Sequence, residues 1–482
     1  AIQPAYDPFY NNELFFSFEE GPLPDTDTIL VLTVQDAILR SVSGEPIFNH
    51  VVDHTNGSID GAPPVMMAAE TGDASGEGFI DRLTLTFSEP VTVTDGNPGD
   101  GVPGFSVSHG YTLKNDDYAQ PPSLSLVLGV NERGITDTDA VPDVTYTAGM
   151  AAVQDAAGLE LAEGNPVVGT LDGASPVIVG RQTLDRDSDG LLDGVRIVFS
   201  EAVADATVDV AEFAVQGTGA LTFASMIGGD VPDDSDIILT FEEGALTTGA
   251  TPDVTYTPVA TLTDLFANPM AADGPVAADD TAPPVMLEAR TLDGDADGRI
   301  DRIRITFSEP VDVLDGRSGD ALPGFAIEPG YQFDNANYGA VDTTAVVLLL
   351  VNQHGPDVRP AIVYDHASGD DSVFDNAGLE LLGGSPVAGT KDGILPAIVA
   401  RMTRDLDGDG YLDAMEVVFS EAIDDASVDS ADFSVSGATV QPFDPLANGD
   451  GADDERIYLL VEDGLLGSGI TPDVQYTQGA LQ

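Results

Sequence analysis

The chain has 482 residues, more than one hydrophobic core usually organises, so several domains are expected. Its 17 Lys and Arg residues against 83 Asp and Glu residues give a net charge of −66, which excludes nucleic acid and anionic membranes as partners because both would repel it. Metal cations or salt are the natural counterions, and the acidity also suits a high-salt habitat. Cysteine is absent, so no disulfide or thiolate metal site is available.

Targeting and catalytic signals are also missing from the sequence. No stretch approaches the roughly 20 consecutive apolar residues of a membrane helix, and no signal segment precedes Ala1, so we expect a mature, secreted product without a membrane span. The five histidines have no metal-binding spacing, and no nucleophile elbow or phosphate loop occurs. The sequence therefore does not predict an enzyme.

An internal repeat organises the chain. Four segments share an acidic loop, an alternating strand and a Phe-Ser-Glu turn, and the Phe residues of that turn are 112, 108 and 112 residues apart, at Phe87, Phe199, Phe307 and Phe419. The first and third copies share an insertion that the others lack, from Asp95 to Phe105 and from Asp315 to Phe325. The duplicated unit was therefore a pair of domains, as in repeat arrays.

In chain order, residues 1–58 read as the last part of a domain, because LFFSFEEGPL from Leu14 resembles IILTFEEGAL from Ile237 and VQDA occurs at Val34 and Val153. They form either a partial domain or a strand-donor segment. Complete domains are predicted at 59–172, 173–280 and 281–392. The fourth, at 393–482, lacks its last strand. Within each, period-two alternation such as Leu83, Leu85 and Phe87 predicts strands with one buried face.

These short strands, bounded by Gly, Pro and Asp, favour an all-β fold of tandem immunoglobulin-like β-sandwich domains in an extended array. The FSEPV turn, the APPVM strand at Ala62 and Ala282, and the late DAAGLEL or DNAGLEL strand resemble bacterial Ig-like repeats. Such repeats occur in surface-layer, adhesion and extracellular filament proteins. The resemblance covers nearly the whole chain and implies an extracellular or cell-surface location.

The acidic loops predict calcium sites. Their pattern is Asp-x-Asp-x-Asp-Gly-x-x-Asp, and alternate carboxylates on a tight Gly-containing turn suit the oxygen cage of Ca²⁺. The first loop departs from the pattern, with Ser and Glu in two of the places, so its site should be weaker. The predicted ligands are Asp73, Ser75, Glu77 and Asp81; Asp185, Asp187, Asp189 and Asp193; Asp293, Asp295, Asp297 and Asp301; and Asp405, Asp407, Asp409 and Asp413.

Each loop joins the first and second strands, so it should lie at the far end of its domain, next to the following one. An aspartate also follows each of the first three domains: Asp172, Asp280 and Asp392. We therefore expect structural Ca²⁺ to bridge loop and junction aspartate and to stiffen the string of domains.

The sequence thus predicts a structural subunit of a calcium-stabilised extracellular filament or surface layer that self-associates head to tail through its ends. The alternative for the ends is a fragment of a longer array or an N-terminal cap. The alternative function is a calcium-stiffened stalk of a cell-surface adhesin that binds carbohydrate or protein.

Overall fold

The structure is a computed structural model that describes residues 60–95, 101–226, 229–315, 322, 324–356, 358–365, 373–445 and 451–477. Of the first 59 residues it describes Thr26 and the backbone of β1 (Gln3–Pro4), β2 (Phe16–Ser17), β3 (Leu32–Val34) and β4 (His50–Val52). The predicted partial domain at 1–58 therefore lies largely outside the described residues, as do 478–482, so the missing last strand of the fourth domain stays a prediction.

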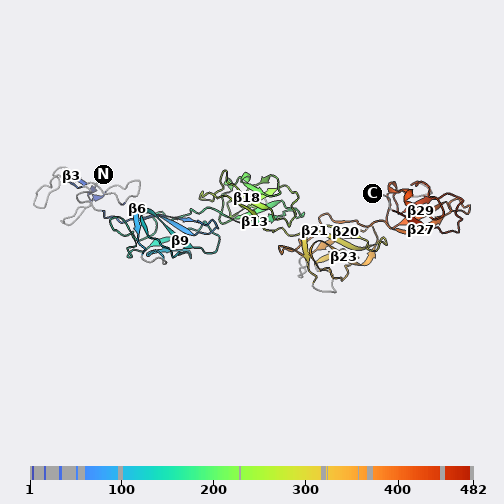
Figure 1. Ribbon diagram of the computed structural model, residues 1–482, viewed down its shortest axis with the longest axis horizontal. Helices are drawn as coiled ribbons and strands as arrows, with labels where there is room; N and C mark the ends of the chain where they lie inside the picture. The colour runs from blue at the N-terminus through green and yellow to red at the C-terminus, as the bar shows by residue number, and fades with distance from the viewer. Residues whose placement is uncertain are drawn as a thin grey trace.

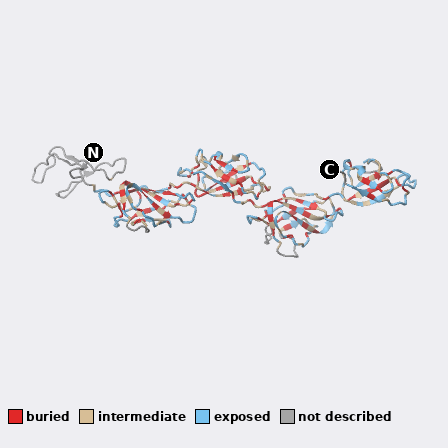
Figure 2. Ribbon diagram, in the orientation of Figure 1, coloured by how far each residue is buried: buried red, intermediate tan, exposed pale blue. Residues whose placement is uncertain are grey.

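The described residues form an all-β protein built from four units that follow one another in chain order along the long axis (Figure 1). We name them by their strands: unit 1 runs from β5 to β12, unit 2 from β13 to β19, unit 3 from β20 to β26 and unit 4 from β27 to β31. Figure 2 shows that the buried residues gather inside each unit. The predicted all-β fold class is confirmed.

Each unit has a larger and a smaller sheet. In unit 1 the larger sheet has the order β12-β5-β6-β9-β8, with β11 also paired to β6, and the smaller sheet is β7-β10. The strands are β5 (Met66–Gly72), β6 (Arg82–Val93), β7 (Phe105–Val107), β8 (Thr112–Leu113), β9 (Gln120–Asn131), β10 (Val144–Tyr146), β11 (Val153–Gln154) and β12 (Thr170–Leu171).

Unit 2 has sheets β13-β14-β17-β16 and β15-β18-β19, and two single-turn 3-10 helices lie between β14 and β15. Its elements are β13 (Ile178–Leu184), β14 (Gly194–Phe199), η1 (Asp205–Thr207), η2 (Val210–Glu212), β15 (Phe213–Val215), β16 (Leu221–Thr222), β17 (Asp236–Phe241), β18 (Asp253–Tyr256) and β19 (Asp273–Ala277).

Unit 3 resembles unit 1, and unit 4 resembles unit 2. Unit 3 has sheets β23-β21-β20-β26, with β25 on β21, and β22-β24, whereas unit 4 has β27-β28-β30 and β29-β31. The strands are β20 (Met286–Leu292), β21 (Ile300–Val313), β22 (Phe325–Ile327), β23 (Ala340–His354), β24 (Ile362–Tyr364), β25 (Val373–Asp375), β26 (Thr390–Lys391), β27 (Ile398–Arg404), β28 (Ala414–Phe419), β29 (Phe433–Val435), β30 (Arg456–Leu460) and β31 (Val474–Tyr476); unit 4 also has η4 (Asp425–Ser427) and η5 (Ser430–Asp432).

The Phe of the Phe-Ser-Glu turn has the same register in every unit. Phe87, Phe199, Phe307 and Phe419 each lie opposite the start of the preceding strand, at Met66, Ile178, Met286 and Ile398, and a bulge follows that pair in all four units. Bulges re-aim a strand locally. The repeat in the sequence is therefore a repeat of strand register.

The two sheets of each unit share one hydrophobic core. In unit 3, Ile303, Ile305 and Phe307 are buried while Arg304 is exposed, as the predicted alternation requires. The smaller sheets add a tilted Phe–Tyr pair with ring centroids 4.9–5.0 Å apart in all four units. The core of unit 2 reaches Ala282 and that of unit 3 reaches Ile394, so each packs two residues past the predicted domain boundary.

Candidate metal sites at the domain junctions

All four acidic loops have one conformation, set by their first aspartate. In the second loop, Asp185 Oδ1 accepts a hydrogen bond from Ser188 N at 2.7 Å and Oδ2 accepts one from Gly190 N at 2.9 Å. Asp73, Asp293 and Asp405 make the same pair of bonds in their own loops, at 2.7–3.0 Å. The last aspartate accepts a hydrogen bond from the backbone N–H that follows the first one, at Asp81, Asp193, Asp301 and Asp413.

The left-handed backbone explains the glycine of the pattern. The residue five places after the first aspartate has φ between +83° and +96° at Gly78, Gly190, Gly298 and Gly410, a region that L side chains rarely adopt. The first loop has this shape although Ser75 and Glu77 replace two aspartates. Backbone hydrogen bonds are therefore enough to shape the loop.

The remaining carboxylates of the loops converge. One oxygen from each of Asp185, Asp187 and Asp189 lies within 4.8 Å of the others, and Asp293, Asp295 and Asp297 form an equivalent group. In unit 4, Asp407 and Asp409 accept hydrogen bonds from Asp409 N and Tyr411 N, so they belong to the same turn. The loops of units 2 and 3 can each offer three carboxylates to a cation.

The loops of units 1 to 3 lie against the following unit, as their position in the chain predicts. An added Cβ on Gly78 would lie 3.0 Å from Val179 Cγ1 of unit 2, and on Gly190 it would lie 2.9 Å from Ser308 Cβ of unit 3. On Gly298 it would lie 2.5 Å from Ser420 Cβ of unit 4. These glycines therefore serve both the turn and the close packing between units.

The junction aspartates meet a different set of acids from the one expected. One oxygen of Asp172 lies within 4.8 Å of oxygens of Glu201 and Asp264, both from unit 2. Asp280 forms the same kind of group with Glu309 and Asp375 of unit 3. These two aspartates thus lie beside acids of the following unit, and a calcium bridge between loop and junction stays a prediction. Asp392 Oδ1 accepts a hydrogen bond from Ile394 N at 3.0 Å, as Asp172 Oδ1 does from Ala174 N at 3.1 Å.

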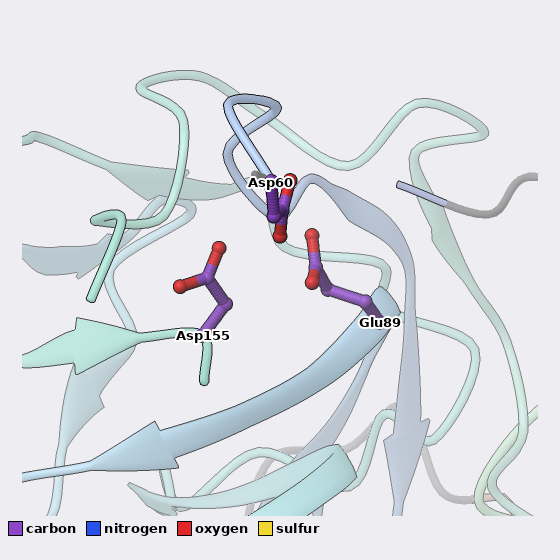
Figure 3. A group of neighbouring side chains, drawn as sticks. All are labelled: Asp60, Glu89 and Asp155. Carbon is purple, nitrogen blue, oxygen red and sulfur yellow. The ribbon is translucent and has the colours of Figure 1, made fainter. Parts of the chain in front are cut away.

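A third group of the same kind joins Asp60, just before unit 1, to two acids of unit 1. Asp60, Glu89 and Asp155 turn their carboxyl groups toward one another, from the segment before β5, from β6 and from the end of β11 (Figure 3). We call these three groups the junction clusters. The Glu follows the junction Asp by 29 residues in each, and the same spacing separates Asp392 from Glu421.

Several cluster oxygens are buried without a hydrogen-bond partner among the described residues: Asp155 Oδ2, Asp172 Oδ2, Glu309 Oε1 and Asp375 Oδ2. Their residues are 5%, 9%, 4% and 4% exposed, respectively. Buried polar atoms are normally paired, and an unpaired one costs about 1–3 kcal/mol. These atoms point to a partner that the protein does not itself supply.

The Ser of the Phe-Ser-Glu turn ties neighbouring units together. Ser200 Oγ lies 2.6 Å from Thr138 Oγ1 of unit 1, and Ser308 Oγ lies 2.6 Å from Thr248 Oγ1 of unit 2. Thr26 makes the same contact with Ser88 at 2.8 Å. Thr26 thus contacts unit 1 in the way that Thr138 contacts unit 2 and Thr248 contacts unit 3.

Burial raises the pKa of the cluster acids. Desolvation is the largest cause, and it raises the pKa of Glu201 to about 8 and that of Glu309 to about 7. The pKa values of Asp172 and Asp280 rise to about 6 for the same reason. Neighbouring carboxylates add to each of these shifts. The clusters therefore resist carrying their full negative charge together.

This arrangement predicts a pH dependence for the cation-free protein. Glu201 and Glu309 hold protons in the folded state at pH values where the unfolded chain, with an ordinary pKa of 4.5, has lost them. The free energy of unfolding should therefore fall as pH rises from about 5 to 8. Urea denaturation after metal removal measures this free energy at each pH. About 1 M NaCl in the buffer screens the repulsion between surface charges. A Glu201→Gln, Glu309→Gln variant should show a shallower slope, and an unchanged slope would contradict this assignment.

The sequence analysis missed the second and third members of the junction clusters. It used the Phe-Ser-Glu turn only to mark the repeat, although the constant spacing of 29 residues between Asp and Glu was visible. The last Asp follows the Glu by 66, 63 and 66 residues, so its spacing varies between units. Only the fold brings Asp155, Asp264 and Asp375 to the same place.

Comparisons with known proteins give few matches. No family model and no curated protein matches the chain. Two similar solved structures are the crystal structure of the S-layer protein rSbsC(31-844) and surface layer protein SbsC, domains 1–6. Each is 11% identical to this chain. The match to the first covers 86% of this chain and 67% of that structure's chain, with a TM-score of 0.17. The match to the second covers 87% of this chain and 68% of that structure's chain, with a TM-score of 0.18. TM-scores this low do not establish a shared fold. No helix in the described residues is long and apolar enough to cross a membrane.

Proposed function

We propose that the chain is a structural subunit of a calcium-stabilised extracellular filament or surface layer, made of immunoglobulin-like β-sandwiches. The observation that carries this proposal is the repeated joint: the same Ser–Thr contact and the same glycine-mediated packing recur between successive units. A joint that repeats along the chain holds units in a row, which is what an extended structural element requires.

Calcium in the acidic loops is part of this proposal. The loops of units 2 and 3 bring three carboxylates together at the end that contacts the next unit. Ca²⁺ takes six to eight oxygen ligands at about 2.3–2.6 Å, which suits such a loop. A bound ion would neutralise the local repulsion where two units meet.

Head-to-tail self-association is the second part. In units 1 to 3 the loop glycine packs against a following unit, but no heavy atom of the described residues lies within 4 Å of a Cβ built on Gly410 of unit 4. Tyr411, Leu465 and Ile470 are exposed in the same unit. A second copy could use there the kind of joint that the chain uses within itself.

The test is the size and shape of the full chain, by light scattering and electron microscopy, in millimolar calcium and then in excess chelator. We expect long regular fibres that shorten or loosen on chelation. Magnesium at the same concentration controls for ionic strength. Compact monomers that chelator leaves unchanged would overturn both the calcium and the assembly proposals. Single extended rods in calcium would favour the stalk of an adhesin, to be followed by screening for carbohydrate or protein ligands.

A further inference from the structure

We propose that the junction clusters are a second class of divalent cation site, separate from the acidic loops, in which Asp172, Glu201 and Asp264, and the equivalent residues at the other two junctions, bind Ca²⁺ directly. The clusters at Asp60 and Asp280 have the same composition and the same position in the fold. The inference goes beyond the proposed function, since it would hold whatever the acidic loops bind.

The geometry suits an ion of the size of calcium. Two oxygens on opposite sides of one Ca²⁺ ion lie about 4.6–5.2 Å apart, twice the Ca–O distance. The cluster oxygens lie within 4.8 Å of one another, which fits around such an ion. Mg²⁺ binds at about 2.0–2.1 Å and keeps several waters, so it would require the three carboxylates to draw closer.

The unpartnered oxygens supply the second line of evidence. Asp172 Oδ1 accepts a hydrogen bond from Ala174 N, whereas its Oδ2 is buried and unpartnered within the described residues. Asp155 and Asp375 behave alike, with Oδ1 accepting from Leu159 N and Leu379 N and Oδ2 unpartnered. In each case the protein orients one oxygen and leaves the other for a ligand. The recurrence in two units makes a chance orientation a poor explanation.

The charges around the cluster favour a positive partner. The charged groups that raise the pKa of Glu201 are Asp172, Asp264 and Asp139, and those that act on Glu309 are Asp280 and Asp375. All five are carboxylates. Three carboxylates in one buried space repel one another unless protons or a cation neutralise them. A divalent ion does this in place of protons, and its binding releases the protons that the acids hold.

The position of the cluster gives the ion a structural role. Asp172 belongs to the segment between units 1 and 2, while Glu201 and Asp264 belong to unit 2. Thr138 of unit 1 donates a hydrogen bond to Glu201 Oε1 at 2.6 Å. An ion at this point therefore fixes the connecting segment to the next unit, and the Thr138 bond links the previous unit to the same Glu.

The experiment is calcium binding to the full chain, by equilibrium dialysis and by the calcium-induced shift in thermal midpoint at pH 8. The test variant is Glu201→Gln, Glu309→Gln, because Gln keeps the shape and the hydrogen bond from Thr138 but removes the charge. Glu132→Gln, at an exposed position, is the matched control. Asp187→Asn, Asp189→Asn removes carboxylates from an acidic loop instead.

We expect the junction variant to bind two fewer calcium ions than the wild type and to lose part of the calcium-induced shift. Its midpoint in chelator should rise, because removal of a repelling charge stabilises the cation-free joint. Circular dichroism verifies folding, and Asp264→Asn gives a second variant. Unchanged ion number and unchanged shift in the junction variants would overturn the inference. If the loop variant alone then lost an ion, calcium in the loops would stand without the junction sites.

Discussion

Replacing Ile305 by Ala is expected to lower the unfolding free energy of unit 3 by about 2–5 kcal/mol. Ile305 is 0% exposed and lies on β21, where it pairs with Ala289 of β20 and Val346 of β23. The truncation leaves a cavity at the centre of the larger sheet. Because units in an array contact only their neighbours, one transition should move while the others stay in place. Urea denaturation and scanning calorimetry measure both.

Two matched variants make this result interpretable. Ile305→Val should cost only about 0.5–1.5 kcal/mol, because it removes one methyl group. Val341→Ala, on the neighbouring strand β23, should be close to neutral because Val341 is 80% exposed. If all transitions moved together in Ile305→Ala, the four units would unfold as one cooperative body, and independent domains would be the wrong description.

Replacing Gly298 by Ala is expected to open the joint between units 3 and 4. The new Cβ would lie 2.5 Å from Ser420 Cβ and 3.3 Å from Ala397 Cβ, so the two units must move apart. The positive φ of +83° adds about 1–2 kcal/mol of backbone strain. Small-angle scattering should show a changed distance between the units, and the connecting residues 393–396 should be cleaved faster by protease.

Gly410 supplies the control for this prediction. Its φ is +94°, so Gly410→Ala carries the same kind of strain, but its added Cβ meets no described atom within 4 Å. The scattering of the isolated chain should stay as in the wild type. Equal changes in both variants would mean that backbone strain alone acts, and that the loop does not position the next unit.

The fold class could be predicted because strand period and repeat spacing are local properties. The alternation around Phe307 and the equal spacing of the Phe-Ser-Glu turns translate directly into a shared register. The boundaries between units could not be placed to the residue, because Ala282 and Ile394 pack backward onto the preceding cores. Which core a junction residue joins depends on tertiary packing, and no local pattern records it.

The candidate sites also differ in how much of their structure the sequence predicts. The acidic loops are contiguous, so spacing alone predicted their shared turn, and their role as calcium ligands stays a prediction. The junction clusters combine an Asp of a connecting segment, the Glu of the Phe-Ser-Glu turn and an Asp more than 60 positions further along, such as Asp264 after Glu201. In so acidic a chain, a single Asp or Glu carries little information by itself. Burial and mutual orientation separate these acids from the many on the surface.

The constant interval between junction Asp and Glu bears on how such a chain can change its length during evolution. Both acids of a joint lie in one continuous stretch that also contains the first strand of the unit, as from Asp172 to Glu201. A recombination event that copies or deletes a whole repeat, with its break before this stretch, keeps the pair intact. Arrays of different length could therefore arise from one gene, and every junction would keep its pair of acids.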